Sequence, residues 1–517
     1  MCKELKIAES INNHIIKEDN RTLSHGDAVV SMILNGLGFT GTPLYMSPQY
    51  FEDKPVELLI GEGIEAKHIN DTALGRTLDS LYKYGITNIF SNIASQSVKI
   101  LGIESKIGHL DSTAFAVHTN YDKSSEDGEI EIVKGHSKDY RPDLNQIALN
   151  MIVENKANLP IYIQASSGNQ SDKIAFGDIV EKQIKNLKND FGIEYIIVDS
   201  ALYTKDNLAK LNKENIWWIT RVPNSLKVIK EMINSIDFKQ FKQIDENYSF
   251  IEMGSFNNAV NQRWMVIYSK DKAYRNHKSI LKKFTTKSNE DMKKIKQYEK
   301  QLFTCKEDAL KSLEVLKKSL KSTLVEGFET VEHKRYSKPG KPKKDALKDV
   351  TEYSLSLLIS SSLTPFYKEK KQAGIFVLAT NQLDNNELRI EELLPEYKHQ
   401  QKVERGFRFL KDPKFHADSI FLKKPERIAA LMMIMTLSLL VYSALEYKIR
   451  KNLKEKSLTF PNQKGKAISN PTTRWVFQYF YSVVLIIVEE ENIYDYFNEN
   501  HSIILECLGD SYLDFYD

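Results

Sequence analysis

The segment from residue 107 to 222 most restricts how this chain can fold, because two kinds of periodicity occur in it in a fixed order. Three apolar stretches of strand length come first, and a helix, a strand, a second helix and another strand follow. A meander of strands that then alternates with helices is typical of a mixed sheet covered by helices, so we predict an α/β fold. The predicted strands are residues 107–118, 145–153, 159–165, 194–198 and 216–220, and the predicted helices are residues 171–187 and 203–211.

Two aspartates stand at special places in this pattern. Asp111 lies inside the first predicted strand, and Asp199 directly follows the fourth. The order of elements is also that of a ribonuclease-H-like fold, in which the centre of the first strand and the end of the fourth lie side by side. By this fold analogy Asp111 and Asp199 come together. An aspartate at a strand end is also a common turn former or helix cap, and Asp199 could serve Ser200 in that way.

A third carboxylate, Glu404, lies on a helix that we predict to open at residue 395 and to end near residue 413. In a regular helix Tyr397, Gln400, Glu404 and Lys411 project at about 0°, 300°, 340° and 320°, which is one narrow face. Such a face could hold a metal ion with Glu404 while Tyr397 and Lys411 touch phosphate oxygens. It could equally be the solvated side of an amphipathic helix. With the two aspartates, Glu404 would suit two Mg²⁺ ions in phosphodiester chemistry.

The rest of the chain suggests further domains. Residues 1–100 indicate a helical N-terminal domain, which is a candidate for DNA binding although no helix-turn-helix is recognisable. Residues 223–370 break the core pattern, and we interpret them as an insertion. The insertion would contain a strand at 263–269, Lys- and Glu-rich helices within 276–325 and a basic loop at 334–344. The predicted domain boundaries are 1–100, 101–222, 223–370, 371–450 and 451–517. The core resumes at residue 371 with a strand at 374–380 and the helix that carries Glu404. The last segment, 451–517, is predicted to be helical.

Residues 428–445 are apolar at nearly every position, and Thr436, Ser438 and Ser443 are the only polar breaks. This length is near the lower limit for a membrane span. A helix that is apolar on all sides also occurs in the core of large soluble proteins. Because charged residues lie on both sides of this single stretch, we favour a buried core helix and keep a membrane helix as the alternative.

The composition allows DNA binding but does not indicate it. The 72 basic and 69 acidic side chains among 517 residues leave a formal net charge of only +3, and local clustering matters more than this total. The three cysteines, at positions 2, 305 and 507, lack metal-binding spacing. They argue against a disulfide framework or a zinc site and favour a reducing cytoplasm. The charged N-terminus does not have the pattern of a signal peptide.

Several motifs together resemble a known family. Tyr397, Gln400, Glu404 and Lys411 follow the spacing of the YREK signature of bacterial insertion-sequence DDE transposases, specifically the cut-and-paste "IS-four" group. That signature has arginine where this chain has Gln400. Further motifs similar to that group occur in family order within about residues 107–450: HLDST (109–113), GHSKDYRPDL (135–144), SGNQSD (167–172), VDSA (198–201), ITRVP (219–223) and RIAAL (427–431).

The resemblance implies a DNA transposase with a ribonuclease-H-like core, in which Asp111, Asp199 and Glu404 are catalytic and bind two Mg²⁺ ions, with Mn²⁺ as a substitute. It implies cutting of transposon ends, a DNA hairpin intermediate and joining to target DNA. A homodimer would bind double-stranded DNA at the element's inverted repeats. The enzyme would act in the bacterial cytoplasm at the nucleoid, without a membrane.

The resemblance and the positions of basic residues near the motifs together suggest DNA contacts. The family places a base-stacking residue in its insertion, and Trp264 is a candidate, although a tryptophan in an apolar strand is more often part of a core. The basic side chains could instead form surface salt bridges. The predicted DNA contacts are Tyr397, Gln400, Lys411, Arg405, Arg408, Arg221, Lys138, Arg141 and Trp264.

Two other functions remain open. One is a ribonuclease-H-like nuclease that cleaves DNA without strand transfer. The other is a DNA-binding relic of a transposase that no longer cuts, which the presence of all three carboxylates argues against and the Gln400 substitution favours.

Overall fold

The computed structural model describes residues 1–15, 21–117, 130–135, 141–337, 347–412, 422, 424–488 and 491–516. The chain divides into two compact units. The first consists of Met1–Arg221, Ser255–Arg263 and Ala379–Asp517, and the second of Val222–Gly254 and Trp264–Leu378. Most of the second unit therefore comes from the segment 223–370, where the sequence departs from the core pattern.

The N-terminal part of the first unit is helical, as predicted. Capping explains two of the helix starts, because Ser24 accepts a hydrogen bond from the Asp27 N–H and Asn70 accepts one from the Ala73 N–H. The helices are α1 (Ile7–His14), α2 (His25–Leu37), α3 (Ser47–Phe51), α4 (Val56–Leu59), α5 (Asp71–Tyr84) and α6 (Ile86–Ile100), with short 3₁₀ turns η1 (Leu44–Met46) and η2 (Ala66–His68).

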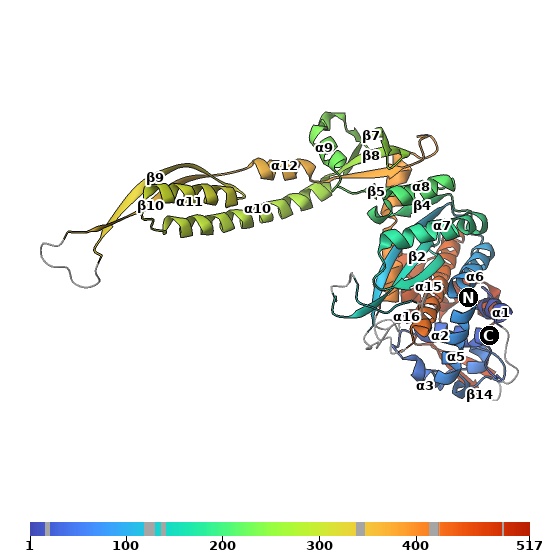
Figure 1. The fold of residues 1–517 in the computed structure, drawn as a ribbon. Helices are drawn as coiled ribbons and strands as arrows, with labels where there is room; N and C mark the ends of the chain where they lie inside the picture. Colours follow the sequence, from blue (N-terminus) through green and yellow to red (C-terminus); the bar gives the residue numbers. More distant parts are fainter. Residues whose placement is uncertain are drawn as a thin grey trace. The chain divides into compact units, whose positions relative to one another are not determined.

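The sheet of the first unit has the predicted topology. Its strands lie in the order β3-β2-β1-β4-β5, in which β1, β2 and β3 are antiparallel neighbours and β4 and β5 run parallel to β1. This is the strand order of a ribonuclease-H-like core, so the predicted fold class is confirmed. Strands β2, β4 and β5 of this sheet are labelled in Figure 1. The strands are β1 (Ile107–Val117), β2 (Asn145–Glu154), β3 (Pro160–Ser167), β4 (Tyr195–Val198) and β5 (Trp217–Val222).

Helices connect the parallel strands of this sheet, as the sequence indicated. Helix α7 (Asp172–Phe191) leads from β3 to β4, and its buried residues include Phe176, Ile179 and Val180 on the predicted apolar stripe. The turn η3 (Ser200–Leu202) and helix α8 (Lys205–Lys213) then lead from β4 to β5. Because β4 runs parallel to β1, these connections place the end of β4 beside the inner part of β1, where Leu110 pairs with Val198.

The apolar stretch at 428–445 lies inside helix α15 (Pro425–Glu455). In the described part of the chain this is the one helix that is long and apolar enough to cross a membrane, with a mean hydropathy of 2.2 over its most apolar window. Within the fold, 94% of that window is buried. Because other parts of the same chain cover it, the helix is a core helix, as we favoured.

The C-terminal segment is only partly helical, in contrast to the prediction. A β-branched run at Val484–Val488 forms strand β14 and pairs with β15 (Glu491–Asp495), because such residues favour strands. The other elements are β12 (Phe460–Pro461), β13 (Ala467–Ile468), α16 (Thr473–Phe480), α17 (Glu499–Leu508) and α18 (Asp510–Leu513).

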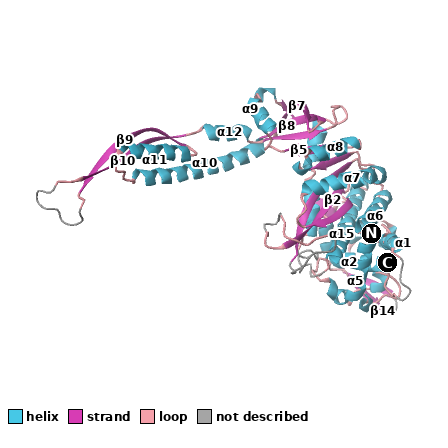
Figure 2. Ribbon diagram, viewed as in Figure 1, coloured by secondary structure: helices cyan, strands magenta, loops and turns pink. Residues whose placement is uncertain are grey.

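The second unit contains the predicted Lys- and Glu-rich helices and a long β-hairpin (Figure 2). Helices α10 and α11 pack with the β9–β10 hairpin around a small core that includes Ile295, Leu313 and Leu355. Strands β11, β8, β7 and β6 are neighbours in that order. The elements of residues 227–380, of which β7, β8 and β11 lie partly in the first unit, are α9 (Lys227–Ser235), η4 (Phe238–Gln240), β6 (Lys242–Gln243), β7 (Tyr248–Asn257), β8 (Val260–Ser269), α10 (Lys270–Glu299), α11 (Lys306–Ser319), β9 (Thr323–Arg335), β10 (Val350–Ser361), α12 (Thr364–Gln372) and β11 (Ile375–Thr380).

Candidate active site

The topology places Asp111 and Asp199 next to each other on neighbouring chain segments. In the parallel pairing of β1 with β4, Leu110 is the register partner of Val198, so the two aspartates are the next residues on both sides. Paired strands are about 4.8 Å apart. Asp199 also caps η3, since its Oδ1 accepts the Ala201 N–H at 2.9 Å. A carboxylate has two oxygens, so this capping role and a role in metal binding are compatible.

The helix that carries Glu404 differs from the prediction. Instead of one helix opening at Pro395, the structure has α13 (Ile390–Lys398) with Pro395 in its interior and a separate α14 (Gln401–Leu410). Buried Leu393 and Leu394 start the first helix ahead of the proline, and this packing outweighs the preference of proline for a helix start. The projection of residues 397–411 onto one helical face was therefore wrong, and residue 413 lies outside the described residues.

Helix α14 nevertheless lies against β1, and a contact at each end holds it there. At its start, Gln400 Nε2 donates to the Leu110 carbonyl at 2.9 Å, and Gln400 Oε1 lies 3.2 Å from His109 Nδ1. At its end, Lys411 Nζ lies 5.6 Å from the centre of the Phe115 ring. The residues at both ends of the helix thus face the strand that carries Asp111.

Distances along the two elements bring Glu404 level with Asp111. Glu404 follows Gln400 by one helical turn, which is a rise of about 6 Å. Asp111 follows His109 by two residues on the same face of the strand, which is about 6.6 Å. Because Gln400 and His109 touch, the two carboxylates come to nearly the same height along β1.

The close approach of α14 to the sheet depends on Gly406. A Cβ at this position would lie 3.1 Å from Leu439 Cδ2 and 3.2 Å from Met151 Cε. Met151 is the register partner of Asp111 in the β1–β2 pairing. The helix therefore rests on the sheet directly beside the aspartate.

The charges of two of the three carboxylates affect the pKa of Tyr397. Burial raises the pKa of its hydroxyl, and the charges of Asp199 and Glu404 raise it further, while Arg221 acts in the opposite direction. The half-buried Tyr397 therefore lies within electrostatic range of Asp199, Glu404 and Arg221. Like any tyrosine hydroxyl at neutral pH it is protonated and can donate a hydrogen bond, and the upward direction of the pKa shift extends this to higher pH.

The three carboxylates lie on or next to paired or packed elements, but they do not form a metal site in this structure. Among the described residues, no three His, Cys, Asp or Glu side chains converge closely enough to hold a metal ion. The donor set still fits Mg²⁺, which prefers carboxylate oxygens and keeps several waters. Asp111 and Asp199 directly follow the register partners Leu110 and Val198, and Glu404 lies on α14, which is held against β1 by Gln400.

The other predicted site residues have mixed placements. Arg405 and Arg408 are exposed on α14, and Arg141 is exposed but held by Asp143 at 2.8 Å. Trp264 is 2% exposed on β8, which does not fit a base-stacking role, because stacking requires an accessible ring face. Lys138 lies outside the described residues, and so does part of the basic loop at 334–344.

A polar cluster beneath the start of α14 was not predicted from the sequence. His109 is 1% exposed, and its Nε2 lies 3.8 Å from Glu396 Oε2. The same Glu396 oxygen accepts from Asn155 Nδ2 at 3.2 Å and lies 3.3 Å from His399 Nδ1. Since these residues come from β1, the β2–β3 turn and α13, only the tertiary structure reveals the cluster.

The charge of Glu396 leads to a pH-dependent prediction. Burial alone would raise its pKa, but His109, Asn155 and His399 bring the pKa from 4.5 down to about 2. A depressed pKa contributes stability that is complete above the unfolded value and is lost as the pH falls toward the folded value. We expect Glu396→Gln to be less stable than wild type at neutral pH, and the gap to shrink from about pH 5 to about pH 2 in urea unfolding. The exposed Glu392→Gln is the control, and a gap that does not change with pH would contradict the assignment.

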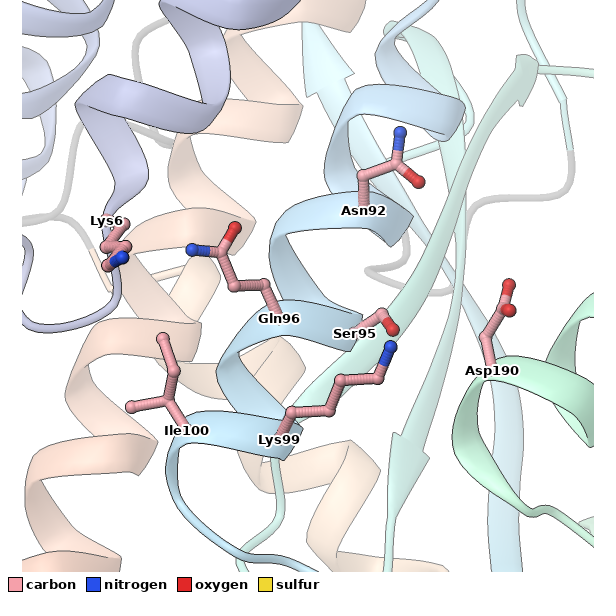
Figure 3. A pocket seen from close by; sticks show the side chains of 7 residues that line it. All are labelled: Lys6, Asn92, Ser95, Gln96, Lys99, Ile100 and Asp190. Carbon is pink, nitrogen blue, oxygen red and sulfur yellow. The ribbon is translucent and has the colours of Figure 1, made fainter.

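A cavity of about 520 Å³ lies elsewhere in the first unit (Figure 3). It is polar and is formed by the start of α1, one face of α6 and the end of α7, and none of the three carboxylates lines it. It is therefore separate from the candidate active site. Its lining residues are Lys6, Asn92, Ser95, Gln96, Lys99, Ile100 and Asp190.

Comparisons with known proteins identify a family for this chain. The family described as "Transposase DDE domain" matches residues 104–441, and a domain of unknown function (DUF4277) matches residues 1–95. Among solved structures, a cryo-electron microscopy structure of the piggyBac transposase synaptic complex with hairpin DNA is similar, with 9% identity and a TM-score of 0.39. The alignment covers 88% of this chain and 76% of that chain. No curated protein matches the sequence.

The match to the DDE domain extends over more than half of the chain and includes Asp111, Asp199 and Glu404. It also includes β1, β4 and α14, the elements on which or directly after which these residues lie. The chain therefore belongs to the DDE transposase family of DNA nucleases and strand transferases.

Proposed function

We propose that this protein is a cut-and-paste transposase of the insertion-sequence "IS-four" group. In this proposal it cuts the ends of its element, passes through a DNA hairpin and joins the ends to target DNA. The observation that carries the proposal is the placement of α14 on β1, which sets Glu404 level with Asp111 while Asp199 follows the neighbouring strand.

In the proposal, Asp111, Asp199 and Glu404 hold two Mg²⁺ ions, for which Mn²⁺ can substitute. Such a metal pair activates the attacking oxygen and stabilises the leaving oxygen when bound. The three carboxylates supply the negative charge that retains the ions and leave coordination positions for water and a phosphate.

Other residues of this chain bind and orient the DNA backbone in this proposal. Tyr397 donates a hydrogen bond from its hydroxyl to a phosphate oxygen. Lys411, at the end of α14, and Arg221, next to Tyr397, add positive charge beside the carboxylates. The exposed Arg405 and Arg408 contact phosphates farther along the duplex.

The proposed partners are the element's inverted repeats and a second copy of the chain, which together form a DNA-bound homodimer. The proposed place of action is the bacterial cytoplasm at the nucleoid. A ribonuclease-H-like nuclease would need the same carboxylates, so only the reaction products separate the two functions.

The test uses the purified full-length chain and a labelled DNA fragment that ends in the element's inverted repeat. With Mg²⁺ we expect a nick at the element end, then a hairpin, and then strand-transfer products with a target plasmid. Chelation of the metal should abolish all three. Nicks without hairpins or joined products would replace the proposal by the nuclease function, and no metal-dependent cleavage would reject both.

A further inference from the structure

We propose that Gln400 is a positioning residue, which ties the start of α14 to β1 and so holds Glu404 at the height of Asp111. This inference rests on the proposed function, because it assigns how one metal-binding carboxylate is kept in place. It also gives Gln400 a different role from the DNA contact that its position in the YREK-like motif suggested.

The polarity of the two hydrogen bonds is determined by their partners. The Leu110 carbonyl can only accept, so the amide group of Gln400 must face it, at 2.9 Å. The Oε1 of Gln400 then faces His109, and because this oxygen only accepts, His109 Nδ1 carries the hydrogen of the 3.2 Å contact. Both ends of the side chain are therefore engaged by β1 residues that directly precede Asp111.

The position of Gln400 in the helix makes these bonds effective. Gln400 has helical backbone angles and is the cap residue of α14, where the separate helix α13 has just ended. The junction contains tight i→i+3 bonds, such as Lys402 N–H to the His399 carbonyl at 2.7 Å. The two helices therefore do not form one rigid rod, and α14 needs its own attachment to the sheet. Glu404 is one turn further along the same face.

The cluster behind His109 fixes the other side of this attachment. His109 lies between Gln400 and Glu396, and Glu396 is bonded to Asn155 in the β2–β3 turn. Lys402 of α14 reaches the same turn, since its Nζ donates to the Asn155 carbonyl at 3.1 Å. Three segments of the core thus converge on the first turn of α14.

The test compares two glutamines that are neighbours in the sequence. Gln400→Met keeps the length and volume of the side chain but removes both hydrogen bonds, and Gln401→Met is the control, because Gln401 is exposed. Mn²⁺ binding to the DNA-free protein is measured from the loss of the free-ion electron paramagnetic resonance signal. Affinity for the element-end DNA is measured separately, in a buffer that contains a chelator, so that no metal ion contributes to DNA binding.

We expect Gln400→Met to weaken Mn²⁺ binding about tenfold or more, which is the usual effect of losing a residue that orients a metal ligand. DNA affinity should stay within about twofold of wild type, as should both properties of Gln401→Met. Gln400→Asn retains an amide that is one methylene too short to reach Leu110, so it should weaken Mn²⁺ binding in the same way even if the methionine variant misfolds.

Two results would overturn the inference: unchanged Mn²⁺ binding in folded Gln400 variants, or a loss of DNA affinity without a loss of metal binding. The variant Glu404→Gln distinguishes a failure of the positioning role of Gln400 from a failure of the proposed function. If Glu404→Gln loses metal binding and cleavage while the Gln400 variants retain both, only the positioning role fails. If Glu404→Gln retains both, the proposed function fails as well.

Discussion

Replacing Asp199 by asparagine should lower the rate of DNA strand cleavage at least about 1,000-fold, which corresponds to about 4 kcal/mol of lost transition-state stabilisation. Asparagine removes the negative charge that a divalent metal requires, yet it can still cap η3 as Asp199 does. The fold should therefore survive, and the loss should lie in the chemistry. Single-turnover cleavage of a labelled element end in Mg²⁺ measures the effect, and thermal unfolding verifies the fold.

The matched control is Asp206→Asn, because Asp206 is an exposed aspartate close to Asp199 in the sequence. It should cleave like wild type. Asp111→Asn and Glu404→Gln should lose activity to the same extent as Asp199→Asn, since three ligands that share one metal pair fail together. If one of the three variants cleaves like wild type, that residue does not belong to the catalytic set.

Replacing Leu437 by alanine should lower the free energy of unfolding by about 2–5 kcal/mol, which is the usual cost of a large cavity in a packed core. Leu437 is 0% exposed in the middle of α15, the helix whose apolar window is 94% buried. Urea unfolding of the full-length chain without detergent, followed by tryptophan fluorescence, measures the change.

Lys454→Ala serves as the control, because Lys454 is exposed near the end of the same helix and should change the stability by less than about 0.5 kcal/mol. The experiment also separates the two interpretations of this helix. A chain that stays in solution only with detergent, and whose stability in water does not respond to Leu437→Ala, would speak for a membrane helix.

Local sequence patterns were sufficient for most elements of the core. A mostly apolar stretch of strand length predicted β1, and the helical spacing of Phe176, Ile179 and Val180 predicted α7, because such patterns record how an element is buried. The same kind of reasoning failed around Pro395. There the packing of Leu393 and Leu394 decided where the helix begins, and local propensity could not account for it.

The candidate site was predictable only in part. Resemblance to several transposase motifs, of which the YREK-like motif contains Glu404, made Asp111, Asp199 and Glu404 the candidates, but a uniform helical projection gave the wrong reason for grouping Tyr397, Gln400 and Lys411. The structure places them on α13, at the junction and at the end of α14, so each reaches the site differently. For Trp264 the resemblance suggested stacking on a DNA base, but the structure shows this residue buried in a strand.

The sequence by itself determined the order of strands and helices, the three acidic residues and the apolar character of α15, since each is written in neighbouring residues or in a motif. Only the tertiary structure decided that the helix breaks after Lys398, that Gln400 is bonded to β1 and that Glu396 joins His109 and Asn155. These contacts join residues that are up to about 290 positions apart in the chain. Their formation depends on how the sheet and its helices pack together, which no local pattern records.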